Sequence, residues 1–174
     1  MVFVDESGAN TKMTRLRGRA LGGRRLVGRI PCGNYQTSTL ISGIRWDGPC
    51  APWLFEGPMN GEMFLAWVEH GLAPVLRAGE LVILDNLATH KIRGVREAIE
   101  ARGAGLRYLP PYSPDFNPIE PMWSKIKQAL RSHAPRNDEQ LLLAAKAAFQ
   151  SISSADCRGF FFSARYATSF MELL

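Results

Sequence analysis

The sequence lacks any apolar run of the length needed to cross a membrane, which is about 18 residues. Its first residues, MVFVDE, have neither the basic lead nor the apolar stretch of a signal peptide. No CxxC pair occurs among its three cysteines, so neither a disulfide framework nor a zinc knuckle is supported. These absences exclude membrane and secreted classes and predict a soluble cytoplasmic protein without a membrane partner.

Acidic residues are absent from residues 7–46, a stretch that is rich in basic ones. These are Lys12, Arg15, Arg17, Arg19, Arg24, Arg25, Arg29 and Arg45. A block of one sign suits a polyanion, because each phosphate neutralised releases counterions and adds affinity. A solvated basic face on an ordinary protein is the alternative, and composition does not separate the two.

Hydrophobic residues make up 46% of the 174 residues, which is enough for one packed core. We therefore predict a single domain over residues 1–174. The first part of the sequence predicts short strands joined by turns. Because these connections are short, we expect neighbouring strands to pair antiparallel. The expected strands are residues 2–4, ending at Asp5, then 26–30, 36–44 and 51–55, with an exposed loop at 12–25.

The second part of the chain predicts a strand–helix–strand unit followed by helices. Residues 81–84 are continuously apolar, which is typical of a strand covered on both faces. The other expected elements are a helix capped by Asn60, a helix at 90–102, a strand at 106–109, a proline-rich loop at 110–118, and helices beginning at Pro118, after Asn137 and near Ala155. This order predicts an α/β fold with a mixed sheet flanked by helices.

Three acidic residues lie at the ends of predicted strands or at the start of a predicted helix, positions where active sites commonly form. Asp5 follows the first apolar strand, Asp85 follows the central one, and Glu120 lies in the first turn of the helix after the proline loop. Carboxylates are the preferred ligands of hard cations such as Mg²⁺, and two such ions suit phosphodiester chemistry. Each acid also has a structural alternative: a strand-end cap for Asp5, an Asx turn for Asp85, and a capping box with Asn117 for Glu120.

Three blocks of sequence resemble the catalytic blocks of mariner-type transposases, nearest to the bacterial insertion-sequence branch. They are VFVDESG at residues 2–8, LDNLATH at 84–90 and LPPYSPDFNPIEPMWSKIK at 109–127. The family's acidic triad is Asp, Asp, Glu, with 34 residues between the last two acids, as between Asp85 and Glu120. The third block is the most specific, because proline loop, acid and basic helix occur together.

The resemblance implies a ribonuclease H-like fold with a five-stranded mixed sheet. It implies a DNA transposase that cuts at transposon ends and joins them to target DNA, usually at a TA dinucleotide, and that acts as a homodimer in the bacterial cytoplasm, associated with the nucleoid. By the same resemblance Asp5, Asp85 and Glu120 hold two Mg²⁺ ions, for which Mn²⁺ can substitute, and Asn86, His90 and Asn117 have supporting roles.

DNA-binding residues are predicted on two surfaces. Helical spacing places Lys127 and Arg131 on the same face as Glu120. The basic segment supplies Arg15, Arg17, Arg19, Arg24 and Arg25. Solvated cations remain the alternative for both surfaces.

One departure from the family concerns the N-terminal helix-turn-helix domains, which precede the first acid in family members. Here the first acid is residue 5, so we expect transposon-end recognition to be encoded elsewhere, and the chain to be a split-frame product, a fragment or a remnant. Two other functions stay open: a nuclease or resolvase of the same fold that does not join strands, and a non-catalytic DNA-binding remnant.

Overall fold

The computed structural model describes residues 1–15, 17–28, 30–32, 35–111 and 113–166. Its sheet has the strand order β3-β2-β1-β4-β5. The strands are β1 (Val2–Asn10), β2 (Thr37–Arg45), β3 (Gly48–Glu56), β4 (Leu81–Leu84) and β5 (Gly105–Tyr108). β1, β2 and β3 pair antiparallel, whereas β4 pairs parallel with both β1 and β5. The predicted five-stranded mixed sheet is confirmed.

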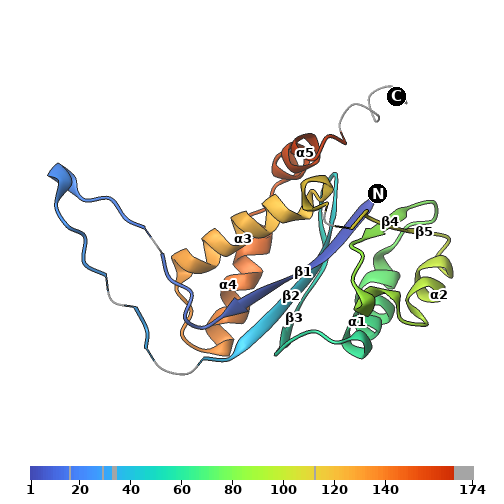
Figure 1. The fold of residues 1–174 in the computed structure, drawn as a ribbon, viewed down its shortest axis with the longest axis horizontal. Coiled ribbons are helices and arrows are strands. Elements are labelled where there is room, and N and C mark those ends of the chain that lie inside the picture. The colour runs from blue at the N-terminus through green and yellow to red at the C-terminus, as the bar shows by residue number, and fades with distance from the viewer. Residues whose placement is uncertain (16, 29, 33–34, 112, 167–174) are drawn as a thin grey trace.

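Helices lie on both sides of this sheet (Figure 1). One side has α1 (Gly61–Trp67), its π-helical continuation η2 (Val68–Leu72) and α2 (Val95–Glu100). The other has α3 (Ile119–His133), α4 (Asp138–Gln150) and α5 (Ser154–Ser163). Short 3-10 turns are η1 (Leu21–Gly23), η3 (Ala73–Val75), η4 (Ala88–Lys91) and η5 (Pro114–Phe116). No helix in the described part of the chain has the length and apolar content to cross a bilayer.

Strand alternation divides the core into two clusters. Val2 and Val4 belong to the cluster with α1 and α2, whereas Phe3 belongs to the one with α3, α4 and α5. β4 does the same, since Val82 and Ile83 belong to opposite clusters. Successive side chains point to opposite faces of a strand, so a short apolar run contributes side chains to both core clusters.

Two helix starts follow the predicted capping chemistry. The Asn60 side chain accepts a hydrogen bond from the Met63 N–H at 2.9 Å, and Asn137 accepts from the Gln140 N–H at 2.8 Å. A side-chain oxygen at this position satisfies one of the backbone donors that the first helical turn leaves free. The elements are therefore set by local sequence at α1 and α4.

Three expected elements differ from the structure. β1 does not end at Asp5 but continues to Asn10, because β2 pairs with it along that whole length. The helix expected at 90–102 is shortened to α2, because Gly94 adopts φ 100° and breaks the regular helix before it. The strand expected at 26–30 is absent at residues 26–28 and 30, while Arg29 lies outside the described residues.

We call residues 11–36, which join β1 to β2, the arm. The described parts of the arm extend away from the sheet (Figure 1). Its apolar side chains are exposed, 83% for Val27 and 72% for Ile30. Arg45, by contrast, lies at the end of β2 in a bidentate ion pair with Glu80, at 2.7 and 3.0 Å. Arg45 is thus structural and does not belong to the basic surface that composition suggested.

Candidate active site

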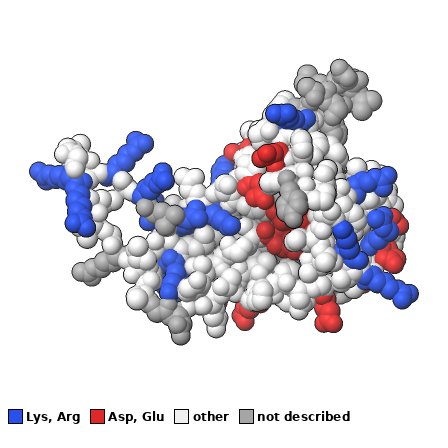
Figure 2. All heavy atoms as spheres, in the orientation of Figure 1, with Lys and Arg blue, Asp and Glu red and all other residues white. Residues whose placement is uncertain are grey.

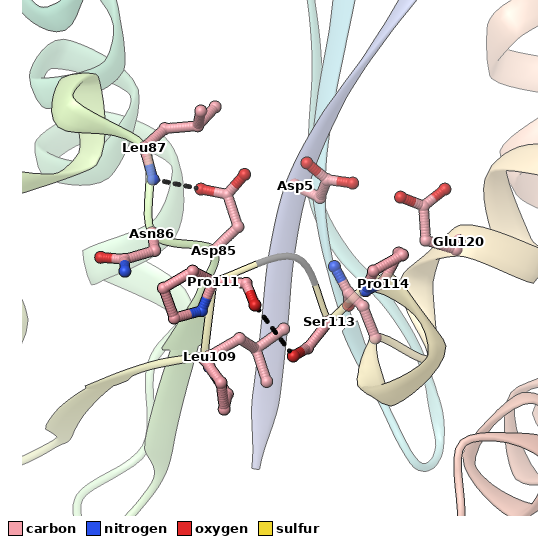
Figure 3. Close-up of a pocket in the computed structure, with 11 residues that line it drawn as sticks. Asp5, Asp85, Asn86, Leu87, Leu109, Pro111, Ser113, Pro114 and Glu120 are labelled. Carbon is pink, nitrogen blue, oxygen red and sulfur yellow. Dashed lines mark hydrogen bonds between the residues drawn. The ribbon is translucent and has the colours of Figure 1, made fainter.

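The three predicted acids line one cavity of about 390 Å³. Asp5 comes from β1, Asp85 from the end of β4, and Glu120 from the first turn of α3. Figure 3 shows the three carboxylates projecting into this space, with Asp5 between the other two. The structure therefore brings together side chains that are far apart in the sequence. Within the described residues, no group of three or more acidic, His or Cys side chains has the spacing that encloses a metal ion.

Strand register explains why Asp5 and Asp85 meet. β1 and β4 are parallel, and Phe3 is the register partner of Ile83. Two residues further along each strand come Asp5 and Asp85, which therefore point to the same face as Phe3 and Ile83. That is the face covered by α3, because Phe3 and Ile83 share their core cluster with Ile119. Glu120, next to Ile119, thus stands over the same edge of the sheet.

Glu120 reaches the cavity without capping its helix. The N-cap of α3 is Pro118, and the cap makes no side-chain hydrogen bond. The Asn117 side chain accepts a hydrogen bond from the Ile119 N–H at 3.4 Å, but Glu120 does not return one to the cap. The capping-box alternative for Glu120 is therefore wrong. Its carboxylate is free to face the cavity while the helix N-terminus favours its negative charge.

Asp5 is the most perturbed acid of the cavity. Burial, followed by repulsion from Glu6, Glu120 and Asp85, raises its pKa to about 7, although the Glu6 N–H donates a hydrogen bond to it at 2.8 Å. No Lys or Arg occurs among the described residues that line the cavity. Asp5 therefore lies in a crowded negative environment that a cation would relieve.

Asp85 is held from behind by a buried histidine. Partial burial opposes its ionisation, but His90, the Leu87 N–H and Lys91 outweigh that effect and lower its pKa. His90 is fully buried, with Nδ1 2.6 Å from Asp85 Oδ1 and Nε2 2.8 Å from Glu6 Oε1. The contact with Asp85 is an ion pair, and Nδ1 makes no hydrogen bond within the described residues.

His90 is positively charged in this arrangement. Burial opposes its protonation, but the two paired carboxylates raise its pKa to about 9. Its ring also packs on Phe64, with 4.3 Å between centroids, and its backbone carbonyl accepts from the Tyr108 hydroxyl at 3.2 Å. His90 therefore does not line the cavity but holds Asp85 from the side away from it.

Glu6 is the site residue that sequence reasoning missed. It follows Asp5 on β1, so its side chain points to the opposite face, toward the cluster that contains Phe64. The signal that could have found it is the pair of adjacent acids in an apolar strand. Adjacent side chains point to opposite faces of the sheet, so the second carboxylate is buried on the other face and requires a partner there. The other predicted neighbours, Asn86 and Asn117, do line the cavity.

The predicted basic residues lie outside the cavity. Arg15, Arg17, Arg19, Arg24 and Arg25 are exposed on the arm, and Lys127 and Arg131 are half-buried along α3. Figure 2 shows Lys and Arg over the arm and the neighbouring body, and Asp and Glu gathered near the centre of the same view. The two charge signs therefore occupy adjoining parts of one face.

Comparison with known proteins identifies the family. The family model described as DDE superfamily endonuclease matches residues 1–142. The chain belongs to the DDE superfamily endonucleases. No curated protein matches the sequence.

Solved structures show the same fold. A pre-cleavage Mos1 transpososome matches with a TM-score of 0.73 at 14% identity, over 98% of this chain and 55% of that one. The catalytic domain of Mos1 mariner transposase matches with a TM-score of 0.69 at 14% identity, over 98% of this chain and 80% of that one. The predicted ribonuclease H-like fold is confirmed. The chain spans about half the length of the transposase chain in the transpososome.

Proposed function

We propose that this DDE superfamily endonuclease is the catalytic domain of a mariner-type DNA transposase of the bacterial insertion-sequence branch. The observation that carries the proposal is the convergence of Asp5, Asp85 and Glu120 on one cavity from three separate elements. A cap or a turn could explain Asp5 or Asp85 alone, but not why three carboxylates share one cavity in a DDE superfamily endonuclease.

The donor set fits two Mg²⁺ ions, with Mn²⁺ able to substitute. Carboxylate oxygens suit both hard cations. The raised pKa of Asp5 supports this fit, because a bound cation would offset both its burial and the repulsion by Glu120 and Asp85. Mos1 paired-end complexes similar to this chain contain Mn or Mg. When bound, the two ions supply activation of the attacking oxygen and stabilisation of the leaving oxygen.

The reaction begins with hydrolysis of a phosphodiester at a transposon end, which frees a 3′-hydroxyl. That hydroxyl then attacks a phosphodiester of target DNA, expected at a TA dinucleotide. The new bond joins the transposon 3′-end to the target 5′-phosphate, and the broken bond releases the 3′-hydroxyl of the target strand. His90 holds Asp85, Asn117 orders the start of α3, and Asn86 faces the cavity. The DNA backbone is gripped by the arm through Arg15, Arg17, Arg19, Arg24 and Arg25, and by Lys127 and Arg131 on α3.

Recognition of transposon ends is assigned to a helix-turn-helix part outside the single domain formed by residues 1–174. We expect the active complex to be a homodimer on DNA in the bacterial cytoplasm, associated with the nucleoid. The assignment of end recognition is supported by coverage, since the match spans 98% of this chain but only 55% of the transposase chain in the transpososome.

The test is a metal-dependent assay of plasmid nicking and of strand transfer from a duplex with a free 3′-hydroxyl. The expected result is activity with Mg²⁺ or Mn²⁺ that Asp85→Ala or Glu120→Ala abolishes. Nicking without transfer, with the helix-turn-helix part supplied, would favour a nuclease or resolvase. Metal-independent DNA binding with no nicking would favour a non-catalytic remnant.

A further inference from the structure

A second hollow, of about 400 Å³, lies where the root of the arm meets α3. Three cations line it: Lys12 from the arm, and Lys127 and Arg131 from α3. None of the three has an acidic partner among the residues that the structure describes. Three unpaired cations around one hollow repel one another, so an anionic group there would stabilise them.

The hollow is built by fixed contacts even though the arm beyond it is exposed. Arg136 donates hydrogen bonds to the carbonyls of Thr11 and Met13, at 3.3 and 3.2 Å, which ties the root of the arm to the connection between α3 and α4. Lys12 Nζ lies 4.5 Å from the centroid of the Tyr35 ring. Since a cation over an aromatic face is attracted by the ring, Tyr35 holds the Lys12 ammonium in place.

The position of the hollow relative to the acids follows from α3. Glu120 begins this helix, and Lys127 and Arg131 come about two and three turns later on the same side. At 1.5 Å per residue they lie roughly 10 and 16 Å along the helix from Glu120. Duplex DNA advances about 3.4 Å per base pair, so for a duplex running along α3 this span corresponds to roughly three to five base pairs.

We propose that the hollow formed by Lys12, Lys127 and Arg131 binds the DNA backbone at phosphates three to five base pairs from the one held by the catalytic acids. The inference rests on the proposed function, because it takes the scissile phosphate to lie at Asp5, Asp85 and Glu120. Phosphates this close to the reacting bond fix its orientation, and orientation is a large part of catalysis in such a site. Tyr35 is a positioning residue that acts through Lys12.

The first test measures the salt dependence of binding to a fluorescent mixed-sequence duplex, in a Glu120→Gln background so that the DNA stays intact. Lys127→Gln and Arg131→Gln are each expected to reduce the slope of log affinity against log salt by about 1, and the double variant by about 2. Arg102→Gln is the matched control, since Arg102 is exposed beyond α2 on the other side of the sheet. An unchanged slope in the double variant overturns the proposal.

Substitutions of Tyr35 test whether it positions Lys12 for DNA binding or only stabilises the fold. Tyr35→Leu is expected to lower the salt slope as much as Lys12→Gln does, whereas Tyr35→Phe keeps an aromatic face and retains the parental slope. Equal slopes for all three variants and the parent would remove Lys12 and Tyr35 from the hollow.

A second test locates the contact. Duplexes are shortened in single base-pair steps on either side of the phosphate that the parent protein cuts. We expect parental affinity to fall once one flank is shorter than about five base pairs, and the Lys127→Gln/Arg131→Gln variant to be insensitive to this step. Identical length dependence in parent and variant overturns the proposal. If no DNA is cut but the salt slopes change as expected, the proposed function fails while the phosphate site stands.

Discussion

The acid cavity and the arm differ in charge and in how the fold holds them. The acids of the cavity come from β1, from the residue that follows β4 and from α3, and all three elements are anchored in a buried core. The arm carries its arginines on backbone with exposed apolar side chains and no regular strand among its described residues. The fold therefore fixes the positions of a few carboxylates in the cavity, whereas the arm presents many arginines with little packing around them.

This difference matches the demands of the proposed reaction. Metal-dependent phosphoryl chemistry requires carboxylates placed within fractions of an ångström, which only packed elements provide. Backbone binding requires positive charge near phosphates and tolerates variation in position. Substitutions in the two regions should therefore fail in different ways: those in the cavity in chemistry or folding, and those in the arm in affinity.

The largest effect is expected for Glu120→Gln. It should reduce Mg²⁺-dependent cleavage by at least about 10³-fold, because one metal ligand is weakened. Stability should change by less than about 0.5 kcal/mol, because Glu120 is exposed and does not cap α3. Cleavage kinetics and thermal unfolding measure both. Glu139→Gln, in the first turn of α4, is the matched control and should leave cleavage unchanged. Parental cleavage in Glu120→Gln would separate Glu120 from the metal site.

His90→Ala is expected to cost about 3 kcal/mol of folding free energy, because it leaves Glu6 and Asp85 without their buried cationic partner. The folded-state pKa of His90 is raised to about 9. Its stabilisation is therefore full below the unfolded value near 6.5 and is lost as pH rises through about 9. Denaturant unfolding of parent and variant across this range measures it.

The control for this prediction is His70→Ala, since His70 is exposed in η2. It should alter stability by less than about 0.5 kcal/mol at any pH in the range. A stability difference between parent and His90→Ala that did not shrink at high pH would mean that His90 is neutral in the fold.

The cavity and the arm also differ in what the sequence predicts. Local signals found β4, α1 and α4, because an apolar run and two asparagine caps act within a few residues. The meeting of Asp5, Asp85 and Glu120 followed from the resemblance, and strand register explains it only once β1 and β4 are known to be parallel neighbours.

The features that local sequence did not predict depend on segments that are distant in the sequence. The apolar residues of the arm predicted a strand at 26–30. No neighbouring strand pairs with the described residues of this segment, so their strand propensity does not produce a strand. β1 runs past Asp5 because β2 pairs with it, which its own composition does not indicate. Glu6 escaped prediction because its partner, His90, is distant in sequence and meets it only after β1 and β4 align.

A substitution set in the arm should have a smaller effect, confined to binding. Replacing Arg15, Arg17, Arg19, Arg24 and Arg25 together by Gln should weaken duplex binding about tenfold near physiological salt. The unfolding temperature should stay unchanged, because these side chains are exposed. Binding titrations at several salt concentrations and a thermal scan test this. Loss of stability without loss of affinity would mean that the arm packs against the body rather than against DNA.

The smallest expected effect is the pH dependence of stabilisation by Mg²⁺. The folded-state pKa of Asp5, about 7, exceeds the ordinary value of an aspartate, 3.8, so between these two values the folded chain keeps a proton there that the unfolded chain has lost. Stability of the metal-free protein therefore falls as pH rises from about 4 to about 7. Binding Mg²⁺ requires that this proton leave, so the ion should raise the unfolding temperature about 2–4 °C more at about pH 8 than at about pH 6. Asp5→Asn should remove this difference, and an equal shift at both values in the parent would show that Asp5 does not bind the ion.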